Sequence, residues 1–96
     1  MTRRNATPTD LVCPCDGVSA REFDGEWIIL DLNGGNYFGL DELGGTVWNQ
    51  LCAGTSPAEI AERFAPQYHV GQATLLQDIL SLLDELLERD LVRVRE

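Results

Sequence analysis

Four residues carry side chains that commonly bind metals or perform thiol chemistry: Cys13, Cys15, Cys52 and His69. Cys13 and Cys15 flank a proline, and two thiolates at this spacing can share a metal ion. A tetrahedral zinc site needs further cysteine or histidine ligands, but neither Cys52 nor His69 stands at motif spacing from the pair. Three cysteines, an odd number, also make no disulfide framework. We interpret these thiols as incidental and predict no metal and no cofactor.

The other polar residues form no recognisable catalytic arrangement. We find no nucleophile–base pair, phosphate-binding loop or carboxylate dyad. His69 falls in a predicted loop, residues 68–71, where a solvated side chain is expected. The sequence therefore predicts a protein that is not an enzyme.

Charge and hydropathy restrict the class of partner. The 96-residue chain has seven arginines, no lysine and sixteen acidic residues, which give a formal net charge of −9. Such a balance repels phosphate backbones and anionic membranes, so nucleic acid and lipid are poor partners. No apolar run approaches the ~18–20 residues that span a bilayer. Arg3 and Arg4 have no apolar segment behind them, as a secretory signal requires. We expect a cytoplasmic protein.

A chain of this length, 44% hydrophobic, holds one small domain. Residues 1–16 are rich in threonine, proline and polar residues and lack periodicity, which predicts a flexible N-terminal arm. Residues 17–96 then form the domain. Its first part contains two hairpin signals, Asp24-Gly25 and Asn33-Gly34-Gly35, because both central residues of a tight primed turn need positive φ.

These turn signals divide a three-stranded antiparallel sheet into residues 18–23, 27–32 and 36–40. In the middle strand, Ile28, Leu30 and Leu32 alternate with Trp27, Ile29 and Asp31, and we expect the first three to face the core. The last strand carries Tyr37 and Phe38 and no charge. Charge-free aromatic strands are unusual at a sheet edge, where unpaired backbone groups invite another strand. We predict that this edge is the functional surface.

Three helices follow the sheet. The first is expected over residues 41–53, where Gly44 and Gly45 cost roughly 1 kcal/mol each relative to alanine and so indicate close approach of a neighbouring element. The second begins at Ser56-Pro57-Ala58-Glu59, a capping box with proline at the first helical position. The third covers about residues 73–89. Residues 91–94 close the chain as a short strand or extended tail.

The third helix has an unusually wide apolar sector. At ~100° per residue, one stripe contains Leu75, Ile79, Leu82 and Leu86, and a second, about 100° away, contains Leu76, Leu80, Leu83 and Leu87. Either the helix packs on two neighbours, or one stripe faces the core and part of the second lines an open groove beside the sheet. The residues alone favour neither alternative.

The order of helices and terminal β-segment resembles the winged helix-turn-helix arrangement, which normally reads DNA. Here the helix in the reading position carries four acidic residues and no basic residue before Arg89. A helix that enters a DNA groove requires the opposite charge. The fold class is therefore α+β and winged helix-turn-helix-like, without a DNA-binding function.

Spaced residues in both halves of the chain form a recognisable pattern. In the first half these are Leu30-Asp31-Leu32, Gly35, Tyr37, Leu40, Gly44 and Trp48. In the second half they are Ile60-Ala61, Tyr68, Asp78-Ile79, Leu82-Leu83, Leu86 and Leu91-Val92. The pattern resembles the PqqD-like proteins, which are peptide-recognition domains known as RiPP recognition elements. The combination of Tyr37 and Trp48 is most similar to the lasso-peptide branch. Cys13-Pro14-Cys15 has no counterpart in the family pattern, and Asp90 replaces a usual glycine.

The resemblance implies that this chain binds the leader of a ribosomally made precursor peptide, added antiparallel to strand 36–40 in the groove beside the third helix. It implies delivery of that precursor to a transglutaminase-like leader peptidase and an asparagine-synthetase-like cyclase. The alternatives are a peptide carrier for a radical-SAM enzyme and a winged-helix transcriptional regulator. The expected leader-binding residues are Asn36, Tyr37, Phe38, Gly39, Leu76, Leu80, Leu83 and Leu87.

Overall fold

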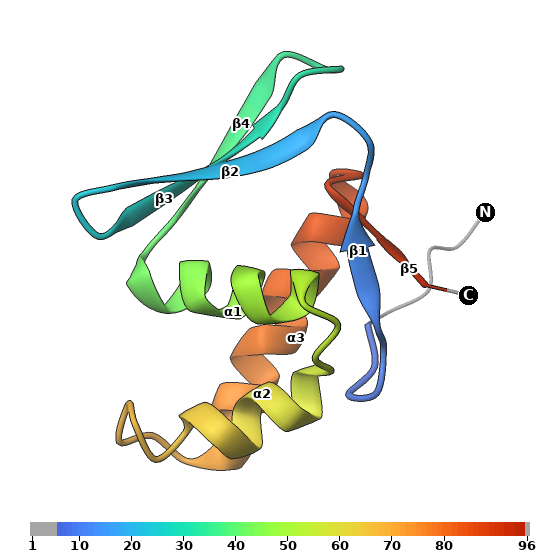
Figure 1. Ribbon diagram of the computed structural model, residues 1–96. Helices are drawn as coiled ribbons and strands as arrows, with labels where there is room; N and C mark the ends of the chain where they lie inside the picture. Colours follow the sequence, from blue (N-terminus) through green and yellow to red (C-terminus); the bar gives the residue numbers. More distant parts are fainter. Residues whose placement is uncertain (1–5, 96) are drawn as a thin grey trace.

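The computed structural model describes residues 6–95 and has the predicted α+β architecture (Figure 1). A three-stranded antiparallel sheet lies across one end of a group of three helices, and a separate two-stranded ribbon lies beside them. In chain order the elements are β1 (Val12–Pro14), β2 (Val18–Phe23), β3 (Glu26–Asp31), β4 (Asn36–Leu40), α1 (Glu42–Cys52), α2 (Pro57–Phe64), α3 (Gln72–Glu88) and β5 (Val92–Val94).

The larger sheet has the order β2-β3-β4, with both pairs antiparallel. Phe23 pairs with Glu26 across the two-residue turn Asp24-Gly25, whose φ angles are 51° and 85°. Positive φ at both central residues makes this a type I′ turn, the geometry that matches the twist of the flanking strands. The predicted hairpin is confirmed.

The prediction of which β3 face is buried is wrong. Ile29 is fully buried and Trp27 packs against the core, whereas Leu32 lies just beyond the strand and is 75% exposed. The cross-strand partners explain which face of β3 is buried, because Ile29 pairs with Ala20 on one side and Phe38 on the other. These three side chains make one continuous apolar layer against the helices, and Ile28 and Leu30 consequently lie on the outer face.

The small ribbon orders part of the segment predicted to be a flexible arm. β1 pairs with β5 antiparallel, with Val12 opposite Val94, and Val12 is fully buried. The preceding residues are also held, since the Ala6 N–H donates to Asp84 Oδ1 at 2.7 Å and the Ala58 N–H donates to the Pro8 carbonyl at 2.9 Å. Residues 1–5 of the predicted arm lie outside the described residues, and the domain boundary at residue 17 stays a prediction.

The predicted close approach of α1 to the sheet is present. A methyl group added at Gly45 would overlap the Trp27 indole, and one at Gly44 would lie 3.1 Å from the Leu40 side chain. Asp41 caps the helix by accepting a hydrogen bond from the Gly44 N–H at 2.7 Å. The two glycines therefore let α1 lie directly against β3 and the end of β4.

The other two helices begin as the sequence indicates. Ser56 and Glu59 form the capping box, with the Glu59 N–H donating to Ser56 Oγ at 3.3 Å. Helix α3 ends at Glu88, and Asp90, two residues later, has the left-handed conformation with φ of 58°. Aspartate tolerates this conformation better than most residues. The core lies between the sheet, the ribbon and the helices, and its largest fully buried side chains include Ile29, Leu51, Ile60, Leu75, Ile79, Leu83 and Leu86.

Candidate functional site: the edge of β4 and the groove beside α3

Strand β4 is one edge of the three-stranded sheet, so half of its backbone groups have no partner strand. The register shows which half. In the two-residue hairpin, Phe23 and Glu26 exchange hydrogen bonds, and the direction of backbone groups then alternates along each antiparallel strand. The backbone N–H and C=O groups of Ile29 therefore point toward β4 and bond those of Phe38. The N–H and C=O groups of Tyr37 and Gly39 point outward along the open edge.

The side chains of β4 divide between the two faces of the sheet. Phe38 packs against the core, and the guanidinium of Arg89 lies 5.0 Å from the centre of its ring. This cation–π contact links β4 to the C-terminal end of α3. Tyr37 points to the other face and is 75% exposed. An incoming strand would thus meet free backbone groups between an aromatic layer inside and an exposed tyrosine outside.

A hollow of about 200 Å³ lies where β4 runs into α1, beside α3. Its walls are mostly apolar, with the carboxylates of Asp41 and Asp78 among them. The lining residues are Asp41, Leu43, Gly44, Val47, Leu75, Asp78, Ile79 and Leu82. The shape and composition suit an aliphatic or aromatic side chain flanked by basic groups.

A second hollow of about 210 Å³ lies at the opposite end of β4, lined by Asp31, Asn36, Tyr37, Phe38, Arg89 and Leu91. The two hollows share the β4–α3 side of the molecule. On α3 they involve Asp78, Leu82 and Arg89, which are spaced four and seven residues apart and so lie on one side of the helix. This side of α3 together with β4 forms what we call the β4–α3 groove.

The structure places the predicted residues in two groups. Asn36, Tyr37, Phe38 and Gly39 lie on the edge strand β4, and the first three line the second hollow. The leucines of the second stripe do not line it. Leu83 is fully buried and Leu87 is 9% exposed, so both belong to the core. Leu76 and Leu80 are half-buried on the side of α3 where Asp84 binds the N-terminal segment.

Sequence reasoning missed Asp78, Leu82 and Arg89. Leu82 was assigned to the core-facing stripe, yet it is only half-buried and lies at the margin of that stripe. An apolar sector as wide as that of α3 has two margins, and the sequence gives no sign of which one faces the sheet. The position of Leu82 beside the polar residue Asp78 is the one available signal.

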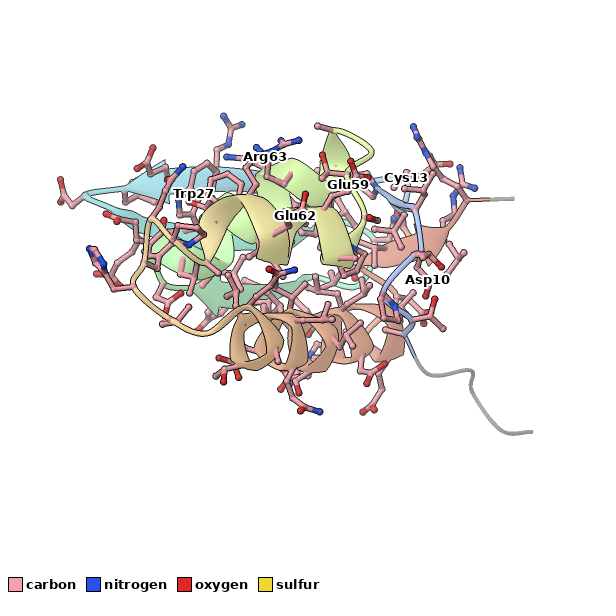
Figure 2. The ribbon with its side chains drawn as sticks, turned by 90° about the horizontal axis from the view of Figure 1, so that it is seen from below. Asp10, Cys13, Trp27, Glu59, Glu62 and Arg63 are labelled. Carbon is pink, nitrogen blue, oxygen red and sulfur yellow. The ribbon has the colours of Figure 1, made fainter. Side chains whose placement is uncertain are left out.

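No cysteine lines this groove, and Figure 2 shows Cys13 on the β1 segment, which runs along one side of the helices. Cys15 lies nearest to it, because its N–H donates at 3.0 Å to the carbonyl of Leu91, which lines the second hollow. Burial raises the pKa of the Cys52 thiol to about 11, with Cys13 as a second cause. Burial likewise raises the pKa of Cys15, assisted by the negative charge of Asp90. Thiols that resist ionisation are poor nucleophiles and poor ligands. Among residues 6–95, no three histidine, cysteine or acidic side chains gather closely enough to hold a metal.

Within the described part of the chain, no helix combines the length and the apolar character that crossing a bilayer requires.

Comparison with known proteins identifies one matching family and two solved structures with a similar fold. The family model for coenzyme PQQ synthesis protein D (PqqD) matches residues 26–92. The solved structure of TbiB1 in complex with the TbiA(beta) leader peptide is 32% identical, covers 84% of this chain and 94% of its own, and superposes with a TM-score of 0.77. The solved structure of a lasso peptide synthetase B1 complexed with the leader peptide is 24% identical, covers 86% of this chain and 98% of its own, and superposes with a TM-score of 0.80. No curated protein sequence matches the chain significantly.

Proposed function

Because this chain belongs to the family of coenzyme PQQ synthesis protein D (PqqD), we propose that it is a peptide-binding module that captures the leader of a ribosomally made precursor. The likeness to TbiB1, which is solved with a leader peptide, supports this proposal and favours the lasso-peptide branch over a carrier for a radical-SAM enzyme. The acidic side chains of α3 disfavour the winged-helix regulator.

The observation that carries the proposal is the open edge of β4 beside an unfilled groove. A leader bound in an extended conformation would pair with the outward N–H and C=O groups of Tyr37 and Gly39. Main-chain hydrogen bonds of this kind supply affinity that does not depend on sequence. Alternate side chains of the added strand would then enter the two hollows and supply specificity.

The lining of the groove suggests what the leader contains. The hollow at the α1 end combines Leu43, Val47 and Leu82 with Asp41 and Asp78. It suits an apolar side chain with a basic neighbour in the leader. At the other end, an apolar group would pack beside Phe38 and Arg89. We propose the refined leader-binding set as Asn36, Tyr37, Phe38 and Gly39 from β4, with Leu43, Asp78, Leu82 and Arg89 from the helices.

A module of this kind needs enzymes to act on what it holds. We propose that it acts in the cytoplasm, where the precursor is synthesised, and that it has no catalytic activity of its own. Its partners are then a transglutaminase-like leader peptidase and an asparagine-synthetase-like cyclase. The support for these partners is the resemblance to the lasso branch.

Amide hydrogen exchange tests the proposal. The full chain is measured alone and saturated with a synthetic leader peptide, for which the TbiA(beta) leader bound by TbiB1 is the first candidate. We expect the amides of Tyr37 and Gly39 to become protected, because they acquire partners. The outward amides of the opposite edge, Ala20 and Glu22, serve as the matched control and should exchange at an unchanged rate. Saturating leader that leaves Tyr37 and Gly39 unprotected would place the binding site elsewhere.

A further inference from the structure

The face of the sheet that points away from the helices carries an exposed apolar surface, of which the β4–α3 groove uses only Tyr37. By the register, Phe23, Ile28 and Tyr37 share this outer face. Phe23 is 60% exposed and Tyr37 75% exposed, and among the described residues only one other large hydrophobic side chain, Leu32, is exposed to this extent. In Figure 1 the helices cover the opposite face. Exposed aromatics gathered on one face of a small domain indicate an interaction site.

These side chains surround an open hollow of about 780 Å³, which we call the outer hollow. Its apolar part comes from the ends of all three strands. Its rim carries four carboxylates, two beside the β2–β3 turn and two at the start of α1. The lining residues are Phe23, Asp24, Glu26, Trp27, Ile28, Tyr37, Gly39, Leu40, Asp41 and Glu42.

The negative charge around the outer hollow indicates which kind of ligand suits it. None of its lining residues is basic. The nearest cation on the same face is Arg21, which pairs with Ile28 from the β2 side and lies outside the lining. A rim of carboxylates around aromatic rings is complementary to a guanidinium, which can bond carboxylates and stack on an aromatic face at the same time. A second copy of this chain would bring another net charge of −9 and is disfavoured.

We propose that the outer hollow binds an arginine side chain, with an apolar neighbour, from a second protein. Its position adds a geometric consequence. Tyr37 and Gly39 present their backbone groups at the leader edge and also line the hollow. A protein seated there would therefore lie next to the bound leader, between the outer face of the sheet and the start of α1, and would share Asp41 with the hollow at the α1 end of the groove.

The test uses the full chain labelled with ¹⁵N and the probe peptide acetyl-Ala-Arg-Leu-Arg-Ala-amide. A control peptide has both arginines replaced by citrulline, which keeps the shape and removes the charge. We expect the arginine peptide to shift the resonances of Phe23, Ile28 and Glu42, and the citrulline peptide to bind at least about tenfold more weakly. The double variant Glu26→Gln/Glu42→Gln should lose a similar factor. Glu22→Gln removes one charge from the other face of β2 and should bind as the unchanged chain does.

Leader affinity is measured on the same variants and should not change, which separates failure of this proposal from failure of the leader site. Three outcomes would overturn it: equal binding of the two peptides, shifts spread over acidic residues of α2 and α3, or no binding at millimolar peptide. Shifts at Phe23 and Ile28 that depend on protein concentration without any peptide would assign the face to self-association and overturn it as well.

Discussion

The two edges of the three-stranded sheet present the same backbone chemistry but different surroundings. On β2 the outward groups belong to Ala20 and Glu22, and to Val18, whose N–H donates to the Cys15 carbonyl at 3.2 Å. On β4 they belong to Tyr37 and Gly39. Strand β2 carries the charges of Arg21 and Glu22, whereas β4 has no charged residue and faces a groove along α3. Charged side chains discourage added strands at an edge. Free hydrogen-bonding groups are thus present at both edges, and the absence of charge on β4 and the hollow beside Phe38 are what distinguish β4 as the proposed leader edge.

The largest expected effect is on leader affinity, and it comes from comparing one substitution on each side of α3. Leu82→Glu would place a charge in the hollow beside β4, where an added strand would have to desolvate it, and we expect leader affinity to fall by about 3 kcal/mol. Leu80→Glu makes the same change on the opposite margin of the helix and should leave affinity unchanged. Both leucines are half-buried, so the thermal midpoints should fall by similar amounts. Fluorescence anisotropy with labelled leader and thermal melts provide the two measurements; equal affinities for the two variants contradict the assignment of the groove.

The second comparison removes one donor from each edge. Gly39→Pro deletes an outward N–H of β4, and Glu22→Pro deletes one from β2; edge positions of this kind tolerate proline. Loss of a main-chain hydrogen bond should cost leader binding about 1–3 kcal/mol for Gly39→Pro and nothing for Glu22→Pro. Gly39→Ala keeps the donor, and its methyl group meets nothing within 4 Å. It should bind the leader as before. Titration calorimetry checks all three variants, and a loss for Glu22→Pro equal to that for Gly39→Pro removes the distinction between the edges.

A third change tests whether the sheet must lie at its present distance from the helices. Gly45→Ala gains about 1 kcal/mol of helix propensity, but its methyl group would overlap the Trp27 indole. Overpacking of this kind costs about 1–3 kcal/mol, so the chain should unfold at lower denaturant concentration. The repacked sheet should also bind leader more weakly at a temperature where the variant is still folded. Urea unfolding gives the stability. A gain in stability would show that α1 and β3 can move apart to admit the methyl group at little cost.

A smaller effect is expected at the end of the groove. Arg89→Ala removes the cation from the Phe38 ring, a contact worth about 0.5–1 kcal/mol at an exposed site. Leader affinity should fall by a few-fold, mostly through faster dissociation. Arg89→Lys keeps a cation and should recover part of the loss. Stopped-flow dissociation measures both variants, and an unchanged rate for Arg89→Ala would exclude the hollow at this end from the leader site.

The smallest effect concerns salt. Because Asp41 and Asp78 line the hollow beside α1, a leader with basic residues should associate about threefold more slowly when ionic strength rises from about 10 mM to about 150 mM. Asp78→Asn should weaken this dependence, and Asp84→Asn, on the far side of α3, should not. An association rate that does not respond to salt would assign the acidic groups a role in solubility alone.

Local signals predicted the elements that form by themselves. The Asp24-Gly25 turn and the Ser56–Glu59 capping box require only neighbouring residues, and both appear as expected. The charge-free strand 36–40 was likewise visible, because a missing charge can be read without knowing the neighbours. The β1–β5 pairing joins two three-residue strands from opposite ends of the chain. Such short strands have almost no local signal, so the ribbon could not be predicted.

The remaining errors arise where two faces are equally apolar. In β3, both Ile28 and Ile29 suit a buried position, and only the partners Ala20 and Phe38 decide between them. In α3, Leu80 and Leu82 stand at opposite margins of one wide sector. Which margin meets β4 depends on how the helix crosses beneath the sheet, and a single sequence does not encode that angle in any local pattern.

The small ribbon determines how this domain can be tethered. Since Val12 lies opposite Val94, β1 and β5 bring segments from near the two ends of the described chain side by side, beside the helices (Figure 1). Proteins fused to the chain would therefore be tethered from this side of the domain. An enzyme joined by a short flexible linker to either end would then experience a bound leader at a similar effective concentration, in the millimolar range for such linkers. Fusion order would be nearly neutral for delivery, and linker length would be the variable that matters.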